Sequence, residues 1–528
     1  MIVGETTLSD FHTDIRLQKK YFERCHVIHF TDGLVDRIKI QRVIDVIRGI
    51  SIEKAVIKLS MSLRNRDGCA GTGGVHPCVE PVASELLVAL SGVIDFVDYI
   101  ELDSITDLDP AILAIIPVQK RIITCYCKMY GHGEQALPSL LGAHQLLTNN
   151  VATKVDAYLY RFITDDGLLS LEFLHKIKAV NVLSYDESEQ GIWSRLCSIY
   201  KGAPVIFTKL GSGCSTSFEF LQNNYELYSL PGKIDCLYGI VSSSFSNQSL
   251  SPLVHNKALR ALQIPALYLS FVINGVKALE GFINRLNAID LPIRGLTITG
   301  PMKAELCASH AFARTVVNKA QSANVLVIKN GQVMLNTTDD IGLKKVLENN
   351  SIEVVGKKVA LIGCGSSGRV AAYTLKKMGA DVVLYNRSQN RGRRAEELLN
   401  LSQFPLRELS LADFDIVVNC APFSVSDALP FYADRFNPYT IVVDFVYSPD
   451  ANSLIHHARR AGLTTIDGRE MFKEQVVAQF ECLMGFPFPR SMSDKLDFII
   501  NKKFSEKDVC RLEGLERVPS FFGENRMG

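Results

Sequence analysis

Residues 357–394 read KKVALIGCGSSGRVAAYTLKKMGADVVLYNRSQNRGRR, and this stretch decides the fold of the second half of the chain. The apolar run Val359–Ile362 is typical of a buried parallel strand. A helical segment, Arg369–Met378, stops at Gly379 and leads into a second apolar strand, Val382–Tyr385. Between the first strand and the helix, three glycines stand in the spacing G-x-G-x-x-G, namely Gly363, Gly365 and Gly368.

A glycine-rich turn between a strand and a helix is the context in which a dinucleotide binds. The first glycine permits the tight turn, the second lets a pyrophosphate approach the backbone, and the third lets helix and strand pack closely. The N-terminus of the helix attracts the negative charge. The alternative is a glycine turn with only structural meaning. We expect a dinucleotide site that includes Gly363, Gly365, Ser366, Ser367 and Gly368.

The tip of the second strand selects the cofactor. NAD sites carry an acidic residue there, about 20 residues after the glycines, to hold the ribose 2′-hydroxyl. This chain has no carboxylate at the tip but instead Asn386, Arg387, Ser388 and, slightly later, Arg391. Guanidinium groups bind a phosphate through paired hydrogen bonds, so these residues predict NADP(H). The alternative is a solvated helix face, which we expect for Arg393 and Arg394.

The composition restricts the class of protein. The chain has 528 residues, 47% hydrophobic and 21% charged, which is enough for two or three globular domains. The net charge of +1 gives no electrostatic case for nucleic acid or a membrane surface as partner. The sequence shows no uncharged apolar run of about 18 residues, the length that predicts a membrane span.

The cysteines and the first residues indicate the compartment. The 13 cysteines have no zinc-ligand spacing, so we predict no metal site and free thiols in a reducing cytosol. The first residues, MIVGETTLSD, lack the basic and apolar regions of a secretory signal. We therefore expect a cytoplasmic location.

The first 230 residues alternate short apolar runs with helical patterns such as Leu168–Lys176. Repeated strand–helix alternation predicts an α/β fold with parallel strands, and a (β/α)8 barrel of the TIM type matches this length. The expected strands are Val27–His29, Ala55–Leu59, Tyr99–Leu102, Arg121–Cys125, Ala157–Tyr160, Ala179–Ser184 and Val205–Phe207.

The pattern breaks near Pro231 and Gly232, and a smaller α/β unit begins at Cys236. The nucleotide cradle continues through later strands, and the helical tail from Arg469 is expected to pack back on the smaller unit. We therefore predict three domains: a barrel at 1–232, a substrate-binding domain at 233–342 plus 469–528, and a Rossmann domain at 343–468.

The smaller unit begins with a serine-rich loop before a helix. Ser249 and Ser251 are spaced to hold a ligand rich in hydroxyl groups. The alternative for Ser251 is an N-cap, because Pro252 after it suits the first helical position. From the residues alone, the cap is favoured.

Two charged residues follow strands in the same unit. Lys303 comes after a strand and a Gly-Pro turn, where ligands of open sheets bind, although a solvated surface lysine is the alternative. Asn324 precedes an apolar run that ends in Asn330-Gly331, a strong signal for a hairpin turn. Asp339, after the hairpin, either pairs with a lysine across a cleft or caps the next helix.

The order of these motifs resembles that of shikimate dehydrogenase. That family shows a Ser-x-Ser-Pro loop, an Asn-Val-Thr-x-Pro-x-Lys turn, an Ala-Val-Asn-Thr segment, an Asn-Thr-Asp-Gly-x-Gly segment and a glycine-rich cradle followed by Asn-Arg-Thr. The corresponding segments here, in the same order, are QSLSPLVHN, TITGPMK, SANVLV, TTDDIG, GCGSSG and NRS, followed by NCAPFSV, VVDFVYSP and DGREMFKEQ. The resemblance covers residues 236 to about 490.

This resemblance implies an NADP-dependent oxidoreductase of the shikimate pathway, which leads to the aromatic amino acids. It implies Lys303 and Asp339 as the catalytic pair, with the lysine moving a proton at the reacting oxygen. The substrate would be held by Ser249, Ser251, Thr299, Asn324, Tyr447 and Gln475. Thr297 and Thr337 stand where the family has Asn, and Asp340 where it has Gly, which would either reduce substrate affinity or shift preference towards quinate.

The N-terminal half resembles type I 3-dehydroquinate dehydratase, a barrel enzyme that forms an imine through a lysine. Arg64 matches a substrate-binding arginine, and Lys154 stands at the Schiff-base lysine. Cys127 occupies the place of the catalytic histidine, Thr72 that of a glutamate, and the loop at Lys209–Cys214 has no arginine. The resemblance therefore implies a degenerate dehydratase half.

We predict an NADP-dependent shikimate dehydrogenase fused to a dehydratase-like barrel, with shikimate and 3-dehydroshikimate as substrates. The alternatives are a fully bifunctional enzyme that also acts on 3-dehydroquinate, a quinate dehydrogenase, and a non-catalytic regulatory homologue. Lys303 and Asp339 favour catalysis over regulation in the second half.

Overall fold

The computed structural model of the chain describes residues 2–6, 27–30, 54–59, 91, 94, 97–104, 108–129, 133–149, 155–209, 216–244, 249–309, 319–421, 436–446 and 454–512. The chain divides into two compact units. The first comprises Met1–Lys233 with Ala288–Asp290, and the second comprises Ile234–Asn287 and Leu291–Gly528. The finer division of the second unit into a substrate-binding and a Rossmann domain stays a prediction.

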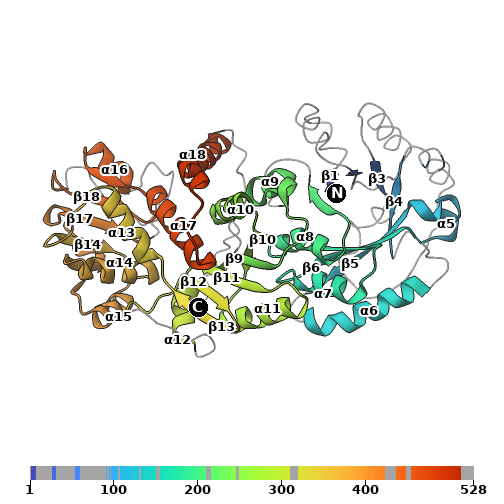
Figure 1. The fold of residues 1–528 in the computed structure, drawn as a ribbon, viewed down its shortest axis with the longest axis horizontal. Coiled ribbons are helices and arrows are strands. Elements are labelled where there is room, and N and C mark those ends of the chain that lie inside the picture. Colours follow the sequence, from blue (N-terminus) through green and yellow to red (C-terminus); the bar gives the residue numbers. More distant parts are fainter. Residues whose placement is uncertain are drawn as a thin grey trace, which may run out of the picture. The chain divides into compact units, whose positions relative to one another are not determined.

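The first unit is built on a parallel sheet. Its described strands are β1 (Ile2–Thr6), β2 (Val27–Phe30), β3 (Lys54–Leu59), β4 (Tyr99–Asp103), β5 (Arg121–Lys128), β6 (Ala157–Ile163), β7 (Val182–Asp186) and β8 (Ile206–Lys209). They lie in the order β7-β6-β5-β4-β3-β2-β1-β8. Figure 1 labels β1, β3, β4, β5 and β6 of this sheet. Each strand from β1 to β7 therefore lies beside its neighbour in sequence, and β8 lies beside β1.

This order agrees with the predicted parallel α/β class and adds one strand. The sequence predicted seven of the strands and missed β1, whose five residues include a glycine and lack a long apolar run. Among the pairings of the described residues, β7 and β8 are the two ends of the order. Closure into a barrel requires these two strands to pair, so the barrel stays a prediction.

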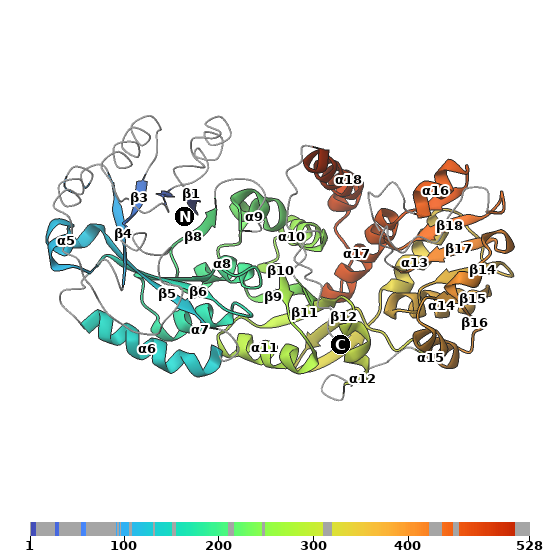
Figure 2. The ribbon, with the colours of Figure 1, turned by 180° about the vertical axis from the view of Figure 1, so that it is seen from behind.

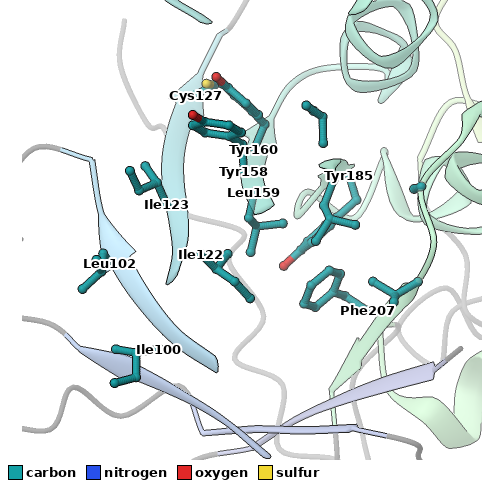
Figure 3. Packing of buried hydrophobic residues seen from close by; sticks show 14 of the residues in the cluster. Ile100, Leu102, Ile122, Ile123, Cys127, Tyr158, Leu159, Tyr160, Tyr185 and Phe207 are labelled. Carbon is teal, nitrogen blue, oxygen red and sulfur yellow. The ribbon is translucent and has the colours of Figure 1, made fainter. Parts of the chain in front are cut away.

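Helices follow several strands of the first unit. They are α5 (Pro110–Ile115), α6 (Gly133–Asn149), α7 (Leu168–Ile177), α8 (Ile192–Ser198) and α9 (Phe218–Tyr225). Strand β6 is buried along its whole central run, as expected for a parallel strand covered on both faces. Figure 3 shows the apolar cluster that results, with Ile100, Ile123, Leu159 and Phe207 contributed by different strands.

The second unit contains a mixed sheet and a parallel sheet. The mixed sheet holds β9 (Cys236–Ser242), β10 (Ala266–Val272), β11 (Ile293–Ile298), β12 (Val325–Lys329) and β13 (Gln332–Asn336), in the order β10-β9-β11-β12-β13. Its helices are α10 (Ser251–Ala261), α11 (Val276–Ala288) and α12 (Met302–Ala308). The predicted hairpin is confirmed, because β12 and β13 pair antiparallel and Asn330 and Gly331 both have positive φ, 52° and 74°.

The parallel sheet holds β14 (Lys358–Ile362), β15 (Asp381–Asn386), β16 (Gln403–Pro405), β17 (Ile416–Asn419), β18 (Ile441–Asp444) and β19 (Thr464–Ile466). Their order, β16-β15-β14-β17-β18-β19, is the 3-2-1-4-5-6 order of a Rossmann fold. The helices α13 (Asp339–Asn349), α14 (Ser366–Lys377), α15 (Gln389–Leu399) and α16 (Leu454–Arg460) belong to this region (Figure 2). The Rossmann prediction is confirmed.

The chain returns to the mixed sheet through α17 (Gly468–Met484), after which α18 (Arg490–Leu512) follows. Asp467 and Glu470 form a capping box that fixes the start of α17. Phe472, Val476 and Phe480 of α17 are buried in one cluster with residues of β9, β10 and β12. The prediction that this tail packs back on the smaller unit is therefore correct.

Candidate active site

The glycine turn has the geometry that the sequence predicted. Gly363 has φ of +98°, which favours glycine. A Cβ on Gly368 would lie 1.8 Å from the Gly363 carbonyl oxygen, so only glycine fits there. A Cβ on Gly365, at the N-cap of α14, would meet nothing within 4 Å. The backbone is thus open at the helix N-terminus, where a pyrophosphate needs to approach.

The residues after β15 form a second loop beside this turn. The Asn386 side chain accepts a hydrogen bond from the Cys364 backbone amide at 3.1 Å and donates to the Ser388 carbonyl at 2.6 Å. The Ser388 hydroxyl accepts from the Arg391 amide at 3.5 Å as the N-cap of α15. Asn386 and Ser388 therefore hold the two loops in one arrangement.

The arginines near this loop differ in their position. Arg391 and Arg394 line a cavity together with Gly365, whereas the exposed Arg387 is not one of the residues described as lining it. Arg394 is exposed, as expected for a solvated face, and it also borders the cavity. Arg369 also lines the cavity, and burial together with the charge of Arg394 lowers its pKa.

The cavity has a volume of about 750 Å³ and lies within the second unit. It brings together most of the predicted substrate and cofactor residues of that unit. They are Ser249, Ser251, Thr299, Lys303, Asp339, Gln475, Gly365, Ser366, Ser367 and Arg391. Asn324 contacts this group through a hydrogen bond to Asp339. Tyr447 lies outside the described residues. Sequence reasoning therefore found a set of residues that are neighbours in space.

Lys303 and Asp339 form an ion pair at the centre of the cavity. The distance between Lys303 Nζ and Asp339 Oδ2 is 2.8 Å, and their side chains are 13% and 2% exposed. Lys303 lies in the first turn of α12, directly after β11 and the Gly-Pro turn. Asp339 is the first residue of α13, whose N-cap is Thr338, so the alternative role of Asp339 as a cap is wrong.

The Asp339 carboxylate is held from a second side. Its Oδ1 accepts hydrogen bonds from Asn324 Nδ2 at 2.6 Å and from Gln475 Nε2 at 3.3 Å. Asn324 is fixed in turn, because its Oδ1 accepts from the Thr338 amide at 2.8 Å. Gln475 reaches this point from α17 past Gly342, where a Cβ would lie 2.7 Å from Gln475 Cγ. The carboxylate orientation is therefore determined by three elements.

The serine loop differs in detail from the prediction. Helix α10 begins at Ser251 with Leu250 as its N-cap and no side-chain cap bond, so the cap role of Ser251 was wrong. Ser249 Oγ accepts from the Ser251 amide at 3.3 Å. Thr299 Oγ1 donates to the Val241 carbonyl at 3.1 Å. These hydroxyls surround the side of the cavity formed by β9, α10 and β11.

Sequence reasoning missed a buried polar network beneath these hydroxyls. Tyr268 of β10 is fully buried, and its hydroxyl bonds to Thr297 Oγ1 and to Ser251. His255 stacks on the Tyr268 ring, with 4.0 Å between the ring centroids, and burial lowers the pKa of His255 to about 4. Thr297 and Ser251 line the cavity, so Tyr268 links two lining residues from behind.

A buried carboxyl near the cofactor loop was also missed. Asp444, at the end of β18, is 3% exposed. Its Oδ1 accepts from Asn419 Nδ2 at 2.9 Å and from the Val446 amide at 2.8 Å. Asn419 in turn accepts from the Ala421 amide at 3.0 Å, and Ala421 packs against Gly363. Burial raises the pKa of the Asp444 carboxyl to about 7.

The predicted residues of the first unit are mostly outside the described part of the chain. This applies to Arg64, Thr72 and Lys154. Cys127 lies in β5, two residues past the end of the predicted strand, and its burial raises the pKa of its thiol to about 12. A thiol with this pKa is a poor proton acceptor at neutral pH.

The sheet of the first unit carries a buried ion pair that the sequence did not reveal. Arg161 of β6 is 5% exposed and lies 3.3 Å from Glu101 of β4 and 2.9 Å from Glu187. The Arg161 guanidinium also lies over the Tyr185 and Phe207 rings. Strand register puts Tyr126, Arg161 and Tyr185 side by side on neighbouring strands. The charge of the buried Arg161 side chain is thus balanced by the two glutamates.

Two general predictions concern thiols and membranes. Eight cysteines have described side chains, and these are free thiols, as expected. Across the described residues, none of the helices combines the length and apolar character needed to cross a bilayer.

Two family models match parts of the second unit. The model described as shikimate dehydrogenase substrate binding domain matches residues 244–326. The model described as D-isomer specific 2-hydroxyacid dehydrogenase, NAD binding domain, matches residues 329–437. The first match covers the serine loop and Lys303, and the second covers Asp339 and the glycine turn.

Curated relatives resemble about half of the chain. The shikimate dehydrogenase (NADP(+)) of Methanothrix thermoacetophila is 32% identical over 245 residues, which is 46% of this chain and 89% of that protein. The shikimate biosynthesis protein AroDE of Chlamydia pneumoniae is 29% identical over 263 residues, 50% of this chain and 52% of that protein. The bifunctional 3-dehydroquinate dehydratase/shikimate dehydrogenase of Arabidopsis thaliana is 26% identical over 334 residues, 58% of this chain and 54% of that protein. The matches thus span about half the length of these last two relatives.

Proposed function

Because the chain belongs to the shikimate dehydrogenase family, we propose that its second unit catalyses the reversible, NADP-dependent reduction of 3-dehydroshikimate to shikimate. The single observation that carries this proposal is the pair Lys303 and Asp339, 2.8 Å apart in a cavity that also contains the glycine turn. One cavity thereby offers an acid–base group and a dinucleotide site, which is what a carbinol dehydrogenase requires.

The cofactor is NADP(H), which supplies or accepts the hydride when bound. The open backbone at Gly365 and the N-terminus of α14 suit its pyrophosphate. Arg391 and Arg394 line the cavity together with Gly365, where guanidinium groups suit a 2′-phosphate. Asn386, Arg387 and Ser388 complete this subsite at the tip of β15. Gly363 and Gly368 shape the turn.

Lys303 moves the proton at the substrate oxygen. In the direction of oxidation, Lys303 accepts the proton of the reacting hydroxyl, and in the direction of reduction it donates one to the carbonyl oxygen. Asp339 compensates the charge of the ammonium and fixes its direction, because its other oxygen is held by Asn324 and Gln475. The pair therefore keeps its geometry while the proton moves.

The remaining hydroxyls and amides recognise the substrate. Ser249, Ser251 and Thr299 line one side of the cavity, and Gln475 lines another. Shikimate carries several hydroxyl groups and a carboxylate, which such donors and acceptors match. We include Tyr447 in this set on the resemblance of VVDFVYSP to the family motif. Thr297 in place of the family's Asn favours quinate as a second substrate.

The first unit is proposed to be a type I dehydratase-like (β/α)8 barrel with a degenerate site. The order of β1 to β8 supports the barrel, and Cys127 at the place of the catalytic histidine supports the loss of function. Lys154 and Arg64 are its candidate imine-forming and substrate-binding residues. A complete 3-dehydroquinate dehydratase needs a base that moves protons, which the Cys127 thiol does not supply at neutral pH.

The test is a spectrophotometric assay of the purified full chain with shikimate and with quinate, each with NADP⁺ or NAD⁺, beside a separate assay of 3-dehydroquinate dehydration without a cofactor. We expect NADPH formation with shikimate and NADP⁺ that far exceeds the rate with NAD⁺. Absence of NADPH formation with both shikimate and quinate would contradict the proposal. If the chain oxidises quinate faster than shikimate, quinate is the preferred substrate instead.

A further inference from the structure

Ser367 contacts the catalytic lysine directly. The distance between Lys303 Nζ and Ser367 Oγ is 3.0 Å, and the two residues are 64 positions apart in the sequence. Ser367 lies in the first turn of α14, the helix that begins at the glycine turn, whereas Lys303 lies in α12 beside the mixed sheet. This hydrogen bond therefore joins the predicted cofactor helix to the predicted proton donor.

The hydrogen bonds of Lys303 show what this contact does. An ammonium group has three N–H donors in a fixed tetrahedral arrangement. One is directed to Asp339 Oδ2 at 2.8 Å and one to Ser367 Oγ at 3.0 Å. With two directions fixed by acceptors on different helices, the third donor has a single direction left. Asp339 alone would leave the ammonium free to rotate about one bond.

The neighbouring serine provides a comparison within the same turn. Ser366 and Ser367 are both half-buried and both line the cavity. Consecutive residues of a helix point about 100° apart, so the two hydroxyls face different parts of the cavity. Among the described contacts, the bond to Lys303 involves Ser367. The sequence assigned both serines to the cofactor, and the structure separates them.

We propose that Ser367 is a positioning residue for Lys303, which holds the ammonium towards the substrate oxygen and links its orientation to the cofactor-binding helix. This inference rests on the proposed function of the second unit. Ser366, by contrast, serves the cofactor alone. Because Ser366 and Ser367 of this turn line the cavity, the bond from Lys303 to Ser367 couples the position of the turn to the orientation of the lysine.

The experiment compares Ser367→Ala with Ser366→Ala, each in the full chain. Alanine favours a helix, so both variants should retain the fold, which thermal unfolding checks. We expect Ser367→Ala to lower kcat about 10-fold or more, as for loss of a hydrogen bond to a charged group, with the Kd of NADP⁺ unchanged. We expect Ser366→Ala to raise the Kd of NADP⁺ instead, and Ser367→Thr, which retains the hydroxyl, to recover most of the loss in kcat.

A second measurement does not depend on turnover. Reductive methylation with labelled formaldehyde, followed by peptide mass spectrometry, reports how accessible Lys303 Nζ is. We expect Lys303 to react faster in Ser367→Ala than in the wild type or in Ser366→Ala, because one of its two fixed contacts is gone. If Lys303 is labelled faster in Ser367→Ala but the wild type does not oxidise shikimate, the positioning role of Ser367 is supported and the proposed function is contradicted.

Two results would overturn the inference. Wild-type kcat together with wild-type labelling in Ser367→Ala would show that the hydrogen bond does not orient Lys303. A raised Kd of NADP⁺ with unchanged kcat and unchanged labelling would make Ser367 a cofactor ligand, as the sequence first predicted.

Discussion

The arginines of α15 give the sharpest test of cofactor choice. Arg391 and Arg394 line the cavity, whereas Arg393 is exposed and is not among the residues described as lining it. We expect Arg391→Ala and Arg394→Ala each to raise the KM for NADP⁺ and to leave the KM for NAD⁺ nearly unchanged, because NAD⁺ lacks the 2′-phosphate. Arg393→Ala is the matched control, with the same loss of charge on the same helix.

The expected magnitude follows from the exposure of these side chains. A hydrogen bond to a charged group contributes ~1.5–3 kcal/mol, which corresponds to roughly 10- to 150-fold in affinity. Both arginines are exposed to solvent, which weakens charge interactions, so we expect the lower end, about 10-fold for each. Arg387→Ala belongs in the series, because Arg387 at the strand tip stays a predicted phosphate ligand.

The assay is initial-rate kinetics with shikimate saturating, repeated at two salt concentrations. Added salt should weaken the binding of NADP⁺ more than the binding of NAD⁺ in the wild type, because it screens the charges of the arginines and the 2′-phosphate. This difference should be smaller in the two variants, which have lost one of these arginines. Equal KM values of Arg393→Ala and Arg394→Ala for NADP⁺ would refute the argument that lining the cavity separates the arginines. A wild type that uses both cofactors equally would refute the choice of NADP(H) altogether.

Four further predictions concern single residues. Lys303→Ala should lower kcat by about 10²–10⁴-fold without weakening NADP⁺, while the exposed Lys345→Ala should change neither value. Tyr268→Phe removes only the buried hydroxyl behind Thr297, so it should raise the KM for shikimate with little change in kcat; an unchanged KM would exclude this support. Asp444 has a pKa raised from 3.8 to about 7, so unfolding releases its proton and stability falls as the pH rises between these values, by up to about 1.4 kcal/mol per pH unit. Asp444→Asn, whose side-chain oxygen can accept the same two bonds, should remove this dependence in urea unfolding, and an unaltered pH profile would disprove it. The full chain should dehydrate 3-dehydroquinate no faster than its Lys154→Ala variant, and rapid dehydration would contradict the loss of function in the first unit.

Local patterns in the sequence were sufficient for the backbone of the second unit. The glycine turn, the Asn330-Gly331 hairpin and the stop at Gly379 each depend on a backbone conformation that few residues adopt. Such positions can be read from residue type alone. The helix starts were less certain, because Ser and Asp suit both an N-cap and the first turn, and both Ser251 and Asp339 proved to lie inside their helices.

Contacts between distant side chains could not be predicted from the sequence. Tyr268 and Thr297 are 29 residues apart, and the hydrogen bond that joins them depends on how two strands of the mixed sheet pack. No periodicity or propensity distinguishes this tyrosine from others buried in the core. The same applies to Arg394, whose share in the cavity depends on the rotation of α15, and to Arg161, whose partners come from other strands.

In the second unit, the chain leaves the mixed sheet and later returns to it, and this path brings together residues of the candidate site. The chain leaves the mixed sheet at α13, builds the Rossmann sheet, and returns with α17. Gln475 on the returning helix bonds to Asp339 at the start of the departing one, and Gly342 lets the two helices approach closely enough for this bond. Lys303 meets Asp339 on one side and Ser367 of the Rossmann helix on the other. Lys303 of α12 therefore bonds to the first turns of both α13 and α14, so its position depends on how the mixed sheet and the Rossmann sheet pack together.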